Sequence, residues 1–257
     1  MTTKKPPSKP GKTGSTTRAA PLRPAGRGRA AVPPPADGQP VSLVDQIYTW
    51  LESKIVTLEL PPGALLSELV IGREFGVSRT PVGEALQRLS REGLVTILPR
   101  RGFVVTEISA TEQLRLLELR REISRFIART GVERASAGER EGLREVAKEF
   151  LTAAKARDEA GVTATDKKFH DLFAACAHNN FAAMAMEPLD SLSRRFSHAH
   201  KMMRDDGMRS AQLHAAIAVA IADGDSGRAE EAADRLADYL EEFVRWTFDR
   251  PRALSGR

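Results

Sequence analysis

Residues 76–94 read GVSRTPVGEALQRLSREGL, and this segment carries the clearest structural pattern in the chain. Four apolar side chains in it recur at the three- and four-residue spacing of one helix face: Val82, Ala85, Leu86 and Leu89. Ser78 or Thr80 can cap the helix, and Pro81 is tolerated in its first turn. We therefore predict a short helix that begins near Ser78 and turns its apolar side toward a core.

A second short helix precedes this one. Ser67 can cap it, and Gly76 is a natural left-handed stop. We expect Leu69, Val70 and Phe75 to face inward. Two short helices joined by a glycine-bearing turn are typical of a helix-turn-helix.

Two further elements flank the helix pair. Apolar side chains at helix-like spacing predict an earlier helix, which ends before Pro61-Pro62-Gly63: Val44, Ile47, Trp50, Leu51 and Ile55. Beyond the pair, residues 94–98 and 103–105 read as two strands joined by a turn. These strands form a wing.

The outer face of the helix near Ser78 suits a DNA groove. Polar and cationic groups at the start of a second helix supply donors for guanine, amides for adenine and backbone N–H groups for phosphate. A wing tip with two arginines and a glycine can approach phosphates or a narrow minor groove. The residues involved are Ser78, Arg79, Thr80, Gly83, Gln87 and Arg91 on the helix, and Arg100, Arg101 and Gly102 on the wing. A small module that binds protein rather than DNA is the alternative.

Residues 62–105 resemble the winged helix-turn-helix of the GntR family of bacterial transcription regulators. The pattern GVSRTPV-x-EAL-x-RL-x-x-EGL, over residues 76–94, matches nearly residue for residue. This resemblance implies that Arg79 and Thr80 contact DNA and that Arg88 reaches its backbone.

One position departs from that family's pattern, because Gly83 stands where an arginine is usual. A glycine costs about 1 kcal/mol of helix stability and removes a guanidinium from the recognition surface. We therefore expect DNA affinity or base preference to differ from those of relatives.

Charge is unevenly distributed along the 257 residues. The net charge is +5, yet residues 1–40 hold eight basic side chains against one acidic side chain, so +7 belongs to this stretch and −2 to the rest. Nine of the fifteen prolines also lie there, and we predict a disordered tail. It is either a solvated spacer or a cationic arm that adds attraction to phosphates.

Composition excludes several protein classes. No apolar run approaches the roughly 18 residues that a membrane-spanning helix needs, so no membrane partner is expected. The single cysteine, Cys176, excludes an intrachain disulfide and a cysteine-built zinc finger, and it fits a reducing cytoplasm. We expect Cys176 to be a buried structural thiol.

The remainder of the chain reads as about six helices. Capping-box patterns begin at Ser109 and Ser136, and further helices are expected at 162–177, 181–204, 208–222 and 227–248. The protein is predicted to be mainly α, with four parts: a disordered tail (1–40), a winged helix-turn-helix (41–107), an all-α antiparallel helical bundle (108–250) and a disordered terminus (251–257).

A metal site is suggested by Asp166 and His170, which lie one helical turn apart on the same face. A carboxylate oxygen and an imidazole nitrogen at that spacing can coordinate one cation, and His214 could supply a third ligand from a later helix. Alternatively, Asp166 and His170 pair with each other and His214 is a hydrogen-bonded core histidine.

The arrangement of these residues resembles the FCD ligand-binding domain of the FadR subfamily. The resemblance is carried by Leu117 to Arg121, Asp166-Lys-Lys-Phe-His170, Asn179-Asn180 and the run from His214 to Asp225. It implies a helical bundle that holds zinc, nickel or another divalent metal through one aspartate and three histidines, beside a small carboxylate effector.

The last histidine of that set is missing from residues 229–239. Asp234 or Asp238 would replace it, or the site binds metal weakly or not at all. His198 and His200 are further candidates, although they fit surface positions equally well.

These features predict a homodimeric transcriptional regulator, a repressor whose binding to double-stranded operator DNA is modulated by a small organic acid. Arg120 and Arg121 are expected to hold the effector's carboxylate. A dimer is expected because one wing and one helix bury little DNA surface, whereas a two-fold protein reads two half-sites.

Two alternatives are a metal-dependent hydrolase built on Asp166, His170 and His214, and a non-specific nucleoid binder driven by the tail. No nucleophile elbow or phosphate-binding glycine loop accompanies the metal residues, so we do not expect an enzyme.

Overall fold

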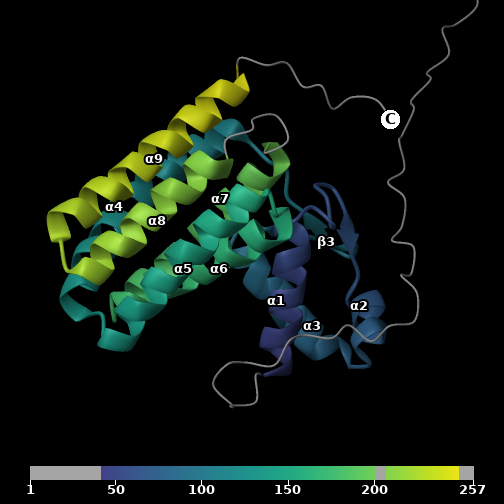
Figure 1. The fold of residues 1–257 in the computed structure, drawn as a ribbon. Helices are drawn as coiled ribbons and strands as arrows, with labels where there is room; N and C mark the ends of the chain where they lie inside the picture. Colours follow the sequence, from purple (N-terminus) through teal and green to yellow (C-terminus); the bar gives the residue numbers. More distant parts are fainter. Residues whose placement is uncertain (1–41, 201–206, 249–257) are drawn as a thin grey trace, which may run out of the picture.

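The computed structural model describes residues 42–200 and 207–248. The predicted tail (1–40) and the predicted disordered terminus (251–257) lie outside the described residues. The described part is mainly helical, as the sequence predicts: a small winged helix-turn-helix is followed by a larger helical bundle, and α1 to α3 gather at one end of that bundle (Figure 1). No helix of this described part is long and apolar enough to cross a membrane.

The winged helix-turn-helix contains three helices and a three-stranded sheet. Its elements are α1 (Leu43–Val56), β1 (Leu65–Leu66), α2 (Glu68–Phe75), α3 (Arg79–Arg91), β2 (Val95–Leu98) and β3 (Gly102–Val105). The strands are antiparallel in the order β1-β3-β2, with Leu66 opposite Phe103 and Leu98 opposite Gly102. Strand β1 was not predicted, because two residues carry no detectable alternation.

The predicted ends of the helix pair are confirmed in position, but Ser67 and Ser78 occupy the N-cap positions without a side-chain capping bond. Gly76 ends α2 in the left-handed region, with φ 69°. Ser78 is the residue before α3, so Thr80 lies inside the helix instead of capping it. The residues Val82, Ala85, Leu86 and Leu89 of α3 are all buried, as its periodicity predicts.

The predicted inner face of α2 was wrong in part. Leu69 and Val70 are 40% and 45% exposed, whereas Ile71 is buried. Ile71 and Phe75 lie four residues apart and define the inner face, and Leu69 lies about 200° around the helix from Ile71. Phe75 does turn inward, since its ring meets that of Trp50 edge to face at 5.1 Å.

Within residues 108–200 and 207–248, six helices form the bundle: α4 (Ala110–Arg134), α5 (Ala137–Ala156), α6 (Glu159–Cys176), α7 (Asn180–His200), α8 (Gly207–Asp223) and α9 (Ser226–Phe248). Ser109 accepts a hydrogen bond from the Glu112 amide, and Ser136 and Glu139 form a complete capping box, so both predicted helix starts are confirmed. The buried face of α8 is largely alanine, which lets neighbouring helices approach closely.

Helix α7 joins the two parts of the molecule. It packs against α4 and α6 on one side and against α1 on the other. Leu192 of α7 packs on the core of the winged helix-turn-helix, and a β-carbon added at Gly93 would lie within ordinary contact distance of it. Among the described helices and strands, α1 and α7 therefore form the main contact between the two parts.

Candidate DNA-binding surface and metal centre

Helix α3 exposes the edge that the sequence predicts to enter DNA. Leu86 and Leu89 are fully buried behind it. The predicted contact residues on the opposite side are exposed: Ser78, Arg79, Thr80 and Gln87 on α3 and its cap, and Arg100 and Arg101 at the wing tip. These side chains are therefore available to a duplex.

Arg88 differs from this group, because it is half-buried and bonded to other side chains of the protein. Its guanidinium stacks over the Tyr48 ring, 3.7 Å from the centroid. It also donates to Glu92 at 3.1 Å and to Glu187 of α7 at 2.7 Å. In this conformation Arg88 links α3 to the bundle, and a phosphate would have to compete for it with three carboxylates, since Asp45 also lies within 3.4 Å.

At two positions of the predicted DNA-binding surface, Gly102 and Gly83, a larger residue would crowd neighbouring atoms of the protein. Gly102 has φ 95°, and a β-carbon there would lie 2.8 Å from the Leu66 carbonyl oxygen, so the pairing of β1 with β3 requires glycine. Gly83 was expected on the exposed face but is buried, and a β-carbon there would lie 3.0 Å from Glu68 Oε1. Gly83 thus belongs to the contact between α2 and α3.

The three predicted metal ligands are brought together. Helix α6 carries Asp166 and His170, and α8 carries His214. Asp166 Oδ1 lies 3.7 Å from His170 Nε2 and 3.8 Å from His214 Nε2. One ligand atom from each residue falls within 4.8 Å of the others. This cluster could hold a metal ion.

His214 is oriented by its other ring nitrogen. His214 Nδ1 lies 2.8 Å from the Ser210 carbonyl oxygen, which can only accept, so Nδ1 carries the proton and the Nε2 lone pair faces Asp166. Burial lowers the pKa of His214 to about 4, which keeps the ring neutral near pH 7. His170 Nδ1 lies 3.3 Å from Asp190 Oδ2, but the geometry is not that of a hydrogen bond, and this buried nitrogen has no hydrogen-bond partner among the described residues. A carbonyl or carboxylate behind a histidine is typical of metal ligands, and this nitrogen and oxygen set suits zinc or nickel.

The proposed substitutes for the missing ligand are wrong. Asp234 forms a two-pronged pair with Arg125, and Asp238 accepts from Arg121 at 2.6 Å. Both carboxylates therefore serve ion pairs between α4 and α9, and neither joins the cluster among the described residues.

The two histidines near the end of α7 take different positions. His200 Nδ1 lies 2.8 Å from the Phe196 carbonyl oxygen, and its ring stacks on that of Phe196 at 4.3 Å. His198 lines the cavity described next, but neither histidine belongs to the three-residue cluster.

A cavity of about 650 Å³ opens beside the cluster. Asp166, His170 and His214 line it together with four cationic side chains: Arg120, Lys155, Arg157 and Arg194. Helix α9 contributes Tyr239 and Phe243 to its wall. Cations outnumber carboxylates in this lining, so the cavity suits an anion.

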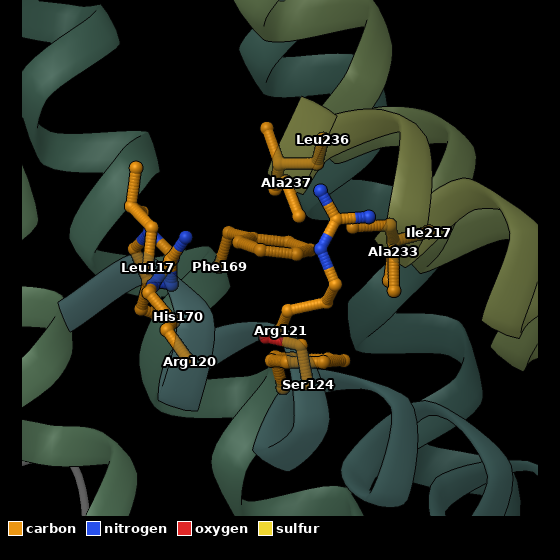
Figure 2. A pocket seen from close by; sticks show the side chains of 11 residues that line it. Leu117, Arg120, Arg121, Ser124, Phe169, His170, Ile217, Ala233, Leu236 and Ala237 are labelled. Carbon is orange, nitrogen blue, oxygen red and sulfur yellow. The ribbon is translucent and has the colours of Figure 1, made fainter. Parts of the chain in front are cut away.

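Of the two arginines predicted to bind the effector, only Arg120 lines the large cavity, although both line a smaller hollow. Arg120 lines the cavity, is buried, and donates from Nε and Nη2 to Asp190 Oδ1 at 3.0 and 2.8 Å. Arg121 turns toward α9 and lines a hollow of only about 10 Å³ (Figure 2), where it pairs with Asp238 and Glu241. Arg121 thus belongs to the junction of α4 and α9.

Arg194 was not predicted as a site residue. Its Nε donates to Asp166 Oδ2 at 2.8 Å, and its Nη1 lies 3.5 Å from Glu52 Oε1. Arg194 and its neighbours carry no spacing that predicts a partner. The Arg194–Glu52 contact could have been suspected from Glu52 instead, because a carboxylate on the buried face of α1 requires a hydrogen-bond donor.

Comparison with known proteins agrees with both halves of this architecture. The model of the bacterial regulatory proteins of the gntR family matches residues 43–105, and that of the FCD domain matches residues 115–239.

An uncharacterized HTH-type transcriptional regulator from the TAR-I ttuE-ttuC' intergenic region of Agrobacterium vitis is 33% identical over 137 residues, covering 52% of this chain and 80% of the relative. The HTH-type transcriptional repressor RspR of Escherichia coli strain K12 is 40% identical over 91 residues, covering 35% of this chain and 39% of RspR.

Among solved structures, E. coli McbR/YncC has the same fold. It has a TM-score of 0.67 and 18% identity, over 81% of this chain and 99% of that one. The matched relatives are transcription regulators and not enzymes, which argues against the hydrolase alternative. With an exposed helix-turn-helix edge and an FCD domain behind it, the chain belongs to the GntR family of bacterial DNA-binding transcription regulators, in the group that carries a C-terminal FCD domain.

Proposed function

We propose that this protein is a homodimeric, cytoplasmic repressor whose operator binding is modulated by a small organic anion in the FCD cavity. The cavity of about 650 Å³ carries this proposal, since it places cationic side chains around the three-residue cluster of Asp166, His170 and His214. RspR, which is 40% identical over 91 residues, is named a repressor, and this supports the sign of regulation.

The cluster would hold a divalent metal beside the effector. Asp166, His170 and His214 supply three ligands, which leaves at least one position for water or an effector oxygen. Bound there, the metal would supply positive charge that attracts a carboxylate. Lys155 and Arg157, at the cavity wall, would bind the rest of the anion.

Operator recognition is assigned to the exposed edge of α3 and to the wing. In this proposal residues 41–107 read DNA, with Arg79, Thr80 and Gln87 in the major groove and Arg100 and Arg101 at the backbone. Residues 108–250 sense the effector and dimerise.

The test begins with the genomic fragment that the purified protein protects from cleavage. Affinity for that fragment would be measured with zinc and a panel of small organic acids, for the wild type, for His170→Ala/His214→Ala and for the control His178→Asn. At least one acid should weaken binding about fivefold or more in the wild type and the control, in the range of ordinary allosteric coupling, and should have no effect on the double variant. An equal response in all three proteins would contradict an effector site at this cavity.

A further inference from the structure

One guanidinium touches both the cavity and the DNA-binding part of the protein. Arg194 of α7 lines the cavity, and its side chain is only 13% exposed. Nε donates to Asp166 on α6 at 2.8 Å, and Nη1 lies 3.5 Å from Glu52 on α1. A single side chain therefore connects a candidate metal ligand to a helix of the winged helix-turn-helix.

Glu52 depends on α7 for its charge partner. It is 5% exposed, and its Oε1 accepts a hydrogen bond from the Ser191 hydroxyl at 2.8 Å. Ser191 and Arg194 lie three residues apart and so share one face of α7. A buried carboxylate that loses its cation is strongly destabilised, so the attachment of α1 to α7 is sensitive to where Arg194 places its charge.

Asp166 divides its two oxygens between different neighbours. Oδ1 faces His170 and His214, at 3.7 and 3.8 Å, while Oδ2 accepts from Arg194. Any charge that arrives at Oδ1 consequently changes the attraction that Arg194 feels at Oδ2.

The other contacts of α7 with the winged helix-turn-helix do not reach the cavity. Glu187 holds Arg88, and Arg195 donates to the hydroxyl and carbonyl oxygens of Thr106. Neither Glu187 nor Arg195 lines the cavity, whereas Arg194 does.

We propose that Arg194 transmits cavity occupancy to the DNA-binding domain by dividing its charge between Asp166 and Glu52. A cation at Asp166 Oδ1 offsets the charge of that carboxylate, so Arg194 pairs more strongly with Glu52 and α1 is held more tightly on α7. An anion in the cavity attracts the guanidinium and releases Glu52. The two ligands thus act in opposite directions on one contact, through different affinities for its two states. This inference rests on the proposed function only in taking the cavity as the effector site.

The first test needs no ligand. Hydrogen exchange of the α1 amides would be compared in full-length, metal-stripped wild type, in Asp166→Asn, and in Asp171→Asn as a matched control. Asp171 is an exposed carboxylate of the same helix, paired with Lys167. Removing the charge of Asp166 should slow exchange in α1 roughly threefold to tenfold, the range of a strengthened charge-assisted hydrogen bond, and the control should not. Unchanged α1 exchange in Asp166→Asn would overturn the proposal.

The second test uses zinc and the variant Glu52→Gln. Zinc should slow α1 exchange in the wild type as Asp166→Asn does, and Glu52→Gln should bind zinc without that response. Slowing of α1 exchange by zinc in Glu52→Gln would overturn the role of Arg194, whether or not Asp166→Asn folds. Failure of zinc to bind the wild type would instead contradict the proposed metal site, and the metal-free comparison would still decide the inference.

Discussion

Gly131 of α4 lies directly against Cys176 of α6: a β-carbon at position 131 would stand 2.6 Å from the cysteine sulfur. The sulfur is buried and cannot move aside without displacing neighbouring side chains. Gly131→Ala should therefore destabilise the protein by about 1–3 kcal/mol, despite the roughly 1 kcal/mol that alanine adds to helix stability.

Denaturant unfolding of a double-mutant cycle measures this contact. Cys176→Ala removes the sulfur, so Gly131→Ala should cost much less in that background than in the wild type. Additive effects of the two substitutions would show that the contact does not limit the approach of α4 and α6.

Cys176 should be chemically inert in the folded protein. Burial raises the pKa of its thiol to about 12, so at pH 8 the thiolate fraction is about one in ten thousand. Reaction with Ellman's reagent should then follow unfolding, and a rate equal to that of an exposed thiol would contradict burial.

The same shift predicts a pH dependence of stability. The thiol pKa is higher in the folded state than in the unfolded state, so its contribution is complete below about pH 9 and is lost as pH rises toward 12. Over this range, the unfolding free energy of the wild type should fall more steeply than that of Cys176→Ala; parallel curves would count against the shift.

Gly83 provides a test of a departure from the GntR pattern. Gly83→Ala favours the helix by about 1 kcal/mol, but the added β-carbon crowds Glu68 Oε1 at 3.0 Å. We expect a net gain below about 1 kcal/mol in the wild type and the full gain in a Glu68→Ala background, by thermal or denaturant unfolding. Equal gains in unfolding free energy in the two backgrounds would mean that the Glu68 side chain moves away from the added β-carbon without loss of stability.

Metal content separates the assigned ligands from the rejected ones. Elemental analysis after incubation with zinc should show about tenfold less metal, or more, in His170→Ala and in His214→Ala than in the wild type. Asp234→Asn and Asp238→Asn should keep full metal content, because these carboxylates pair with Arg125 and Arg121. Loss of metal from either aspartate variant would show that the substituted aspartate contributes to metal binding.

Local signals in the sequence predicted most of the helices. Ser109 and Ser136 mark helix starts through side-chain bonds to nearby amides, and Gly76 marks an end through its backbone conformation. Asp166 and His170 were also predictable as a pair, since four residues separate them on one helix.

Interactions between distant segments could not be predicted in this way. Arg88 bonds to a carboxylate 99 positions away, and Glu52 and Arg194 meet across 142 positions. Periodicity reports which face of a helix is buried but not which other helix covers it. For this reason Arg88 and Arg121 looked available to ligands, although tertiary packing gives each of them protein partners.

The most direct test of operator recognition by the exposed edge of α3 compares the wild type with Arg79→Ala. The affinity of each protein is measured for the protected genomic fragment and for a scrambled duplex, at moderate ionic strength. The wild type should prefer the fragment by about a thousandfold or more, and Arg79→Ala should lose about 1–3 kcal/mol on the fragment with little change on the scrambled duplex. The control Arg235→Ala, on α9, should bind like the wild type. No preference of the wild type for any genomic fragment, or equal losses on both duplexes, would contradict base readout by Arg79.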